Sequence, residues 1–309
     1  MVFLKKNRLL LLFLILFGAG AAVTASPNRH LLVITWGGNS TEWNQALHLS
    51  GVRIGCSDVP ASCIQQMDQM AASQHVSSVF LGILLNPANV ATNAATFGNL
   101  AASHPNLTEV GFDDFLSQCE KTRLGPGELS SLLETVASNL KSRSSRVQFG
   151  VTIYQDQLIT GELDRLQLSD AARRSIDLVH LFPHFRKERK SVTDYVAEAK
   201  RAFPNANIII GIYAYDRREY LPCSADIHVP CSNEEEIDLF DKVLREDLRI
   251  ASSGGAIGVE FFPGNFGAED NWKGWNNSRA CKQGERDVCV QNTVTMRQKV
   301  RDAMKNSDQ

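Results

Sequence analysis

The chain has 309 residues and a formal net charge of −2, with 43% hydrophobic and 21% charged residues. This is the composition of an ordinary globular protein. It carries no basic stripe, and a near-neutral charge balance does not provide the electrostatic footprint that binding to phosphate backbones requires. We therefore expect no nucleic-acid partner.

The first residues have the pattern of a secretory signal peptide. A basic start, MVFLKKNR, precedes an apolar stretch over 9–23, and the small residues Val23 and Ala25 stand where a signal peptidase reads the chain. This pattern predicts a signal peptide over 1–25, a secreted or periplasmic protein, and a single domain over 26–309. The alternative is a leader that stays uncleaved as an N-terminal anchor.

The cysteines fit an oxidising compartment. Six of the seven form local couples that would each close a short loop: Cys56/Cys63, Cys223/Cys231 and Cys281/Cys289. Such couples favour disulfides in an exported protein, and Cys119 is left over as an expected buried thiol. The cysteine and histidine spacings do not match those of a zinc site, and we expect neither a metal nor a cofactor.

Short apolar runs rich in β-branched residues recur along the chain. Because they are continuously apolar rather than alternating, they are typical of strands buried on both faces. These runs cover 30–36, 76–85, 107–112, 146–154, 176–182, 207–215 and 255–262.

Amphipathic segments lie between these runs, with apolar residues at helical spacing over 127–143, 191–203 and 233–251. Repeated strand–helix units predict an α/β fold with a parallel sheet, and a domain of this size favours a (β/α) TIM-type barrel of seven or eight strands. The eighth strand would be a short one near GVRIG at 51–55, or the barrel would be irregular. An open doubly wound sheet is the alternative, but no G-x-G-x-x-G follows the first strand.

In a barrel of this type the active site lies at the C-terminal ends of the strands. Carboxylates, aromatic rings, histidines and arginines gather at the predicted ends. Sugar rings stack on flat faces, and glycoside hydrolysis needs a proton donor with a base or nucleophile, so this rim predicts a site for an oligo- or polysaccharide. The candidates are Trp36, Asp113, Asp114, Tyr154, Gln157, His180, His184, Arg186, Tyr213, Tyr215, Asp216 and Glu260.

The stretch VGFDDF places two carboxylates, Asp113 and Asp114, side by side after a strand. Adjacent strand residues point to opposite faces, so we expect only one of the two to face the barrel mouth and the other to be structural. The second catalytic carboxylate should then come from another strand, either Asp216 or Glu260.

The order of motifs resembles a loosely defined group of bacterial exported barrel proteins that are regarded as glycoside-hydrolase-like. The resemblance spans roughly 107–262 and rests on GFDDF, VTIYQDQL, IDLVHLFPHF, IIIGIYAYDRREYLP and GAIGVEFFPG. The sequence departs from the group at Phe182 and His184, where the group tends to have tryptophans, and at Glu260, where it tends to be apolar. The matching residues are Asp113, Asp114, Phe115, Tyr154, Gln157, Leu158, Asp177, Tyr213, Tyr215 and Asp216.

We therefore expect a glycosidase in which Asp114 is the acid and Glu260 or Asp216 is the nucleophile or base. Asp113 is a further candidate for the catalytic set. Trp36, Tyr154, Gln157, His180, His184, Arg186, Tyr213 and Tyr215 would position the sugar. One rival is a barrel that binds glycan without catalysis, and the other is a metal-dependent hydrolase that uses Asp113, His180 and His184.

Overall fold

The structure of the chain, a computed structural model, describes residues 31–38, 41–56, 59–183, 191–213, 234–262 and 294–305. Its strands form a closed barrel in the order β1-β2-β3-β4-β5-β6-β7-β8, and neighbouring strands are parallel all the way round. This is the (β/α) barrel that the sequence predicts, and of the seven or eight strands expected it has eight. The strands are β1 Leu32–Trp36, β2 Gly51–Gly55, β3 Ser78–Ile83, β4 Leu107–Phe112, β5 Gln148–Tyr154, β6 Leu178–Phe182, β7 Asn207–Tyr213 and β8 Gly258–Phe262.

The eighth strand is β2, the short GVRIG segment that the sequence indicated. The apolar runs at 30–36, 76–85 and the later positions all contain the strands expected there. Register across β2 and β3 is continuous from Gly51↔Ser78 to Gly55↔Gly82, whereas β3 and β4 shift register between Val79 and Phe80.

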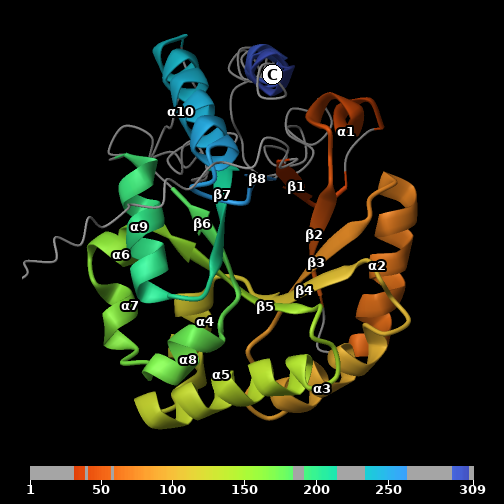
Figure 1. Cartoon of the computed structure of the whole chain (residues 1–309), viewed down its shortest axis with the longest axis vertical. Coiled ribbons are helices and arrows are strands. Elements are labelled where there is room, and N and C mark those ends of the chain that lie inside the picture. The colour runs from red at the N-terminus through yellow and green to blue at the C-terminus, as the bar shows by residue number, and fades with distance from the viewer. Residues whose placement is uncertain are drawn as a thin grey trace, which may run out of the picture.

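The helices lie outside the ring of strands, where their apolar faces cover it (Figure 1). The three amphipathic segments predicted as helices form α5, α9 and α10. The described helices are α1 Thr41–Leu47, α2 Pro60–Gln74, α3 Val90–Leu100, α4 Phe115–Thr122, α5 Pro126–Lys141, α6 Gln155–Ile159, α7 Glu162–Arg165, α8 Asp170–Ser175, α9 Val192–Ala202 and α10 Glu234–Ser252. None of the helices described is long and apolar enough to cross a bilayer.

Residues 294–305 are also helical and join the first and last units of the barrel. Arg297 and Arg301 lie over the Trp43 ring of α1, 4.7 and 5.6 Å from its centroid. Lys299 lies 3.6 Å from carboxylate oxygens of Asp238 and Asp241 on α10. In Figure 1 this terminal helix accordingly lies between α1 and α10.

One predicted disulfide is confirmed: Cys56 after β2 is bonded to Cys63 in α2. Cys119 is a free, buried cysteine in α4, as expected, and burial raises the pKa of its thiol. The couples Cys223/Cys231 and Cys281/Cys289 lie outside the described residues, as does the predicted signal peptide.

The barrel interior begins with an apolar layer. Ile34, Phe80, Leu178 and Ile209 form a cluster of their own, separate from the large core that lies between strands and helices. Successive inward-pointing residues of a strand are two positions apart, or about 6.6 Å, so each strand contributes to stacked layers. The next layer, towards the C-terminal ends of the strands, consists of ionisable rather than apolar side chains.

Candidate functional site

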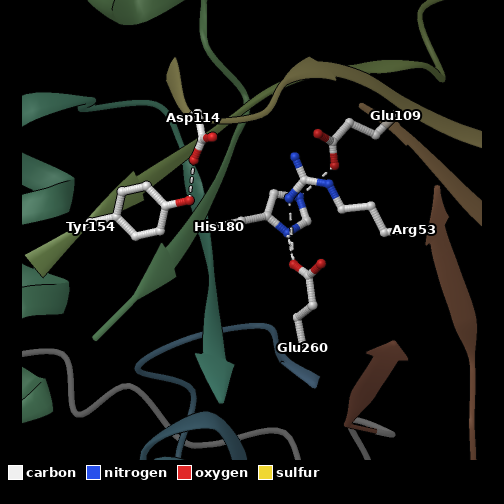
Figure 2. Close-up of polar contacts among 6 residues, drawn as sticks. All are labelled: Arg53, Glu109, Asp114, Tyr154, His180 and Glu260. Carbon is white, nitrogen blue, oxygen red and sulfur yellow. Dashed lines mark hydrogen bonds and ion pairs between the residues drawn. The ribbon is translucent and has the colours of Figure 1, made fainter. Parts of the chain in front are cut away.

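A layer of four charged or ionisable side chains fills the barrel interior below the rim. Arg53, Glu109, His180 and Glu260 come from β2, β4, β6 and β8, and Figure 2 shows them pointing towards one another. Barrel layers of this kind are built from four side chains of alternate strands, which are usually branched and apolar. All four here are 0% exposed. The layer is therefore one of the standard barrel layers, occupied by ionisable groups.

His180 links the two carboxylates of this layer. Its Nε2 lies 2.6 Å from Glu109 Oε2, and its Nδ1 lies 2.5 Å from Glu260 Oε2. Arg53 Nη1 lies 3.5 Å from the same Glu260 oxygen. With His180 protonated, two positive and two negative charges balance, which is the condition under which buried charges are tolerated.

The pKa values follow from this balance. Burial and the Arg53 charge lower the pKa of His180, but the two carboxylates outweigh them and the net shift is upwards from 6.5. Burial opposes ionisation of Glu260, yet His180 and Arg53 bring its pKa below 4.5. Glu260 is consequently held as a carboxylate and His180 as an imidazolium.

Glycines on neighbouring strands make room for this layer. A Cβ atom at Gly111 or Gly150 would overlap the Glu109 carboxyl group, and one at Gly211 would overlap the Phe182 ring. A charged residue that shares the inward face of its strand with a glycine occurs three times: Arg53 in GVRIG, Glu109 in EVG and Glu260 in GVE. Arg53 and Glu109 are not among the predicted site residues, and this pairing of a charge with a glycine two positions away is the sequence signal that indicates them.

Above this layer, aromatic rings from four strands form an arc along the rim. The arc runs Trp36, Phe262, Tyr213, Phe182, with successive ring centroids 6.1, 5.5 and 5.1 Å apart. Arg53 Cζ lies 5.1 Å from the Trp36 ring centroid, so Trp36 joins the arc to the buried layer. The arc provides flat apolar faces of the kind on which sugar rings stack.

Asp113 lies at the rim, next to the arc. A Cβ at Gly82 would lie 3.3 Å from the Trp36 ring and 3.7 Å from Asp113 Cβ, so this glycine leaves space between the two. Burial raises the pKa of the Asp113 carboxyl above 3.8. The Arg53 charge opposes this rise, while the charges of Asp114 and Glu260 add to it. A raised carboxyl pKa in a partly buried position is what a general acid needs.

Asp114 is exposed and begins α4 in the left-handed conformation, with φ 46° and ψ 48°. Its carboxylate accepts a hydrogen bond from the Tyr154 hydroxyl of β5 (Figure 2). Burial, with the nearby charges and Tyr213, raises the pKa of the Tyr154 phenol, so Tyr154 stays a donor. The expectation that one of the adjacent aspartates faces away is therefore wrong, because the left-handed residue breaks the alternation of the strand and brings both to one mouth.

Gln118 of α4 holds the backbone that carries these aspartates. Its Nε2 donates to the Asp113 carbonyl and lies 3.4 Å from the Ile83 carbonyl, and its Oε1 accepts from Leu85 N at 2.5 Å. The ends of β3 and β4 are thus joined through one side chain. No local sequence pattern indicates this role.

Two predicted site residues lie deeper than expected. His180 and Glu260 are the middle residues of β6 and β8, two positions before Phe182 and Phe262, and so one layer below the rim. Both nitrogens of His180 are engaged, which leaves none to position a sugar. Glu260 is paired with His180 and Arg53 in this buried layer, and its expected role as nucleophile or base stays a prediction.

Gln157 also has a different position from the one expected. Its Oε1 accepts a hydrogen bond from Tyr154 N at 3.1 Å and caps the start of α6. The Gln157 side chain also lines a depression of about 110 Å³, together with Asp164, Arg173 and Arg201. Asp177, part of the resemblance, accepts from Phe149 N at the opposite end of the barrel. His184, Arg186, Tyr215 and Asp216 lie outside the described residues.

The alternative of a metal-dependent hydrolase would require a cluster of metal-ligating side chains. Within the part of the chain that the structure describes, no three His, Cys, Asp or Glu side chains are arranged to hold a metal ion. The proposed set included His184, which lies outside that part, and His180, whose nitrogens bind carboxylates.

No protein-family model and no curated protein matches the chain. Similar solved structures include the Ignisphaera aggregans GH53 catalytic domain, with 13% identity, TM-score 0.47 and coverage of 72% of this chain and 78% of that one. The exo-β-1,4-mannosidase Op5Man5 from Opitutaceae bacterium strain TAV5 has 12% identity and TM-score 0.49, with 88% and 60% covered. A GH18 chitinase from Pseudoalteromonas aurantia has 11% identity and TM-score 0.45, with 80% and 98% covered. All three TM-scores are below 0.5, and at this level the likeness assigns no reaction or residue to this chain.

Proposed function

We propose that the protein is an exported glycoside hydrolase that acts on an oligo- or polysaccharide at the C-terminal rim of its barrel. The leader over 1–25 would direct export, and residues 26–309 would form one domain. The proposal is carried by Asp113, a partly buried carboxyl group with a raised pKa that lies beside an aromatic arc. A general acid is one of the groups that glycoside hydrolysis requires, and the aromatic arc beside it would hold the sugar ring.

Asp113 replaces Asp114 as the proposed acid, because Asp113 lies beside the aromatic arc and burial raises the pKa of its carboxyl group. It would protonate the leaving oxygen while Trp36 and Tyr213 hold the sugar ring. Asp114 lies on the same mouth, in contact with Tyr154. Asp216, outside the described residues, keeps its predicted role as an alternative nucleophile or base.

The test is hydrolysis by the purified protein of 4-methylumbelliferyl glycosides and of unmodified polysaccharides. On the unmodified polysaccharide, Asp113→Asn should lower kcat by about 10²–10⁴-fold. Asp170→Asn, the same change at the exposed start of α8, should leave kcat unaltered. Equal turnover of the polysaccharide by wild type and Asp113→Asn would reject this role for Asp113.

A glycan-binding barrel without catalysis is the second candidate, and one observation favours it. The charge of Glu260, the carboxylate expected from another strand, is held by Arg53 and His180. Titration calorimetry with oligosaccharides distinguishes the two cases, since binding without turnover of any bound sugar would establish the binding role.

A further inference from the structure

The adjacent aspartates cannot flank a glycosidic bond in the usual way. Mechanisms with two carboxylates place them on opposite sides of the bond, about 5–5.5 Å apart in retaining enzymes and about 6.5–9.5 Å apart in inverting ones. Asp113 and Asp114 are consecutive residues at the end of β4, and both approach the mouth from that side. One of them can act as acid, but the attacking group has to come from elsewhere.

The Asp114–Tyr154 pair has the hydrogen-bonding character that an amide requires. The Tyr154 hydroxyl donates its one hydrogen to the Asp114 carboxylate at the rim, and an amide that enters between the two would exchange this one hydrogen bond for two. An amide presents the complementary pair, a carbonyl acceptor and an N–H donor. The left-handed backbone at Asp114, costly for a residue other than glycine, is what brings this carboxylate to Tyr154.

Arg53 gives an independent sign that a ligand enters this mouth. Its Nη1 lies 3.5 Å from Glu260 Oε2, whereas its Nε and Nη2 are buried with no hydrogen-bond partner among the residues described. The guanidinium lies under the Trp36 ring, and its charge acts on Asp113. Buried donors are rarely left open, so a sugar hydroxyl that reaches below Trp36 would complete the set.

We infer that the substrate is a β-linked 2-acetamido-2-deoxy sugar, whose own acetamido oxygen is the nucleophile. This inference rests on the proposed function and specifies its substrate class. Tyr154 donates to the acetamido oxygen and Asp114 accepts from the N–H, while Asp113 faces the leaving oxygen. Substrate-assisted attack needs no carboxylate on the far side of the ring.

The steps balance without a cofactor. The acetamido oxygen forms a bond to C1 as the bond from C1 to the leaving oxygen breaks, and the Asp113 proton moves to that oxygen. The resulting oxazolinium N–H donates to Asp114. Water then adds to C1 as the bond from C1 to the acetamido oxygen breaks, and it gives a proton to the Asp113 carboxylate, which restores the acetamide with retained configuration. The acetamido oxygen must attack opposite the leaving group, which selects the β-linkage for glucosamine and galactosamine derivatives.

The experiment compares 4-methylumbelliferyl β-glycosides of N-acetylglucosamine and N-acetylgalactosamine with those of glucose and galactose. A second series replaces N-acetyl by mono-, di- and trifluoroacetyl, which weakens the amide oxygen as a nucleophile. We expect turnover of the acetamido sugars only, with kcat falling at each added fluorine. Asp114→Asn should lower kcat about 10²–10³-fold and Tyr154→Phe about 10²-fold, against no change for Asp170→Asn.

The outcomes separate this inference from the function on which it rests. Hydrolysis of glucosides or galactosides, or a rate indifferent to fluorination, would overturn the acetamido inference and leave a glycosidase with a protein nucleophile. Hydrolysis of no glycoside would overturn both. Tyr154→Phe guards against a folding defect, since the change removes one oxygen from a tyrosine whose ring stays in place.

Discussion

Replacing His180 with leucine tests whether the buried layer is held together by charge balance. The substitution removes two short contacts, 2.6 Å to Glu109 and 2.5 Å to Glu260, in an environment with 0% exposure. Two carboxylates are then left with Arg53 as the remaining cation. Removing one partner from a buried ion pair costs about 3–5 kcal/mol, so we expect a loss of that size in the free energy of unfolding at pH 6.

The assay is equilibrium unfolding in urea, followed by circular dichroism. His104→Leu is the matched control, because His104 pairs with Asp68 at the surface, where ion pairs contribute about 0–1 kcal/mol. The double variant His180→Leu/Glu109→Gln removes one negative charge as well, and should recover part of the loss. A His180→Leu variant within about 1 kcal/mol of wild type would refute the charge-balance argument.

The same layer sets how stability depends on pH. The folded-state pKa of His180 is raised, so its stabilisation is present below pH 6.5 and is lost as pH rises through the folded pKa. The folded-state pKa of Glu260 is lowered, so its contribution is present above pH 4.5 and is lost as pH falls through the folded pKa. The difference between wild type and His180→Leu in the free energy of unfolding should therefore decrease as the pH rises above 6.5.

Three further predictions concern other parts of the barrel. Gly150→Ala places a Cβ in the Glu109 carboxyl group and should lower the free energy of unfolding by about 1–3 kcal/mol. Gly127→Ala, where the added Cβ meets open space, should be neutral or slightly stabilising. Equal urea midpoints for the two variants would contradict this. Reducing the disulfide between β2 and α2, with a sequence separation of 7, should cost about 2–3 kcal/mol, and an unchanged midpoint in reductant would argue against it. Asp114→Asn removes a charge that raises the pKa of Asp113, so the basic limb of the pH profile of kcat/KM should move to lower pH. A shift of this limb to higher pH would be inconsistent with the assigned contacts.

Most of the architecture could be predicted from local pattern. Continuous apolar runs separated by amphipathic segments are sufficient to indicate a parallel barrel, and the short GVRIG segment was identified as its eighth strand. Strand boundaries were approximate, as at 76–85, where the strand is Ser78–Ile83. The spacing of apolar residues shows which residues are buried, and the pattern of burial is enough to distinguish strands from helices and so to predict the fold.

The site is harder to predict, because the depth of a side chain in the barrel and the direction in which it points depend on how the strands assemble. Whether His180 lies at the rim or one layer below it depends on where β6 ends relative to its neighbours, which no local pattern shows. Arg53 and Glu109 were missed because a charge within a strand becomes meaningful only when three other strands supply its partners. Asp114 was expected to follow strand alternation, and its left-handed backbone was not apparent from the sequence.

The most direct test of the proposed function is how the loss in Asp113→Asn depends on the leaving group. A general acid matters most when the departing oxygen is a poor leaving group, and little when that oxygen leaves readily as a phenolate. We predict that Asp113→Asn loses about 10²–10⁴-fold in kcat/KM on an oligosaccharide, loses far less on a 4-methylumbelliferyl glycoside, and no longer shows the basic limb of the pH profile. Equal losses on both substrates, with the basic limb intact, would contradict the assignment of Asp113 as the acid.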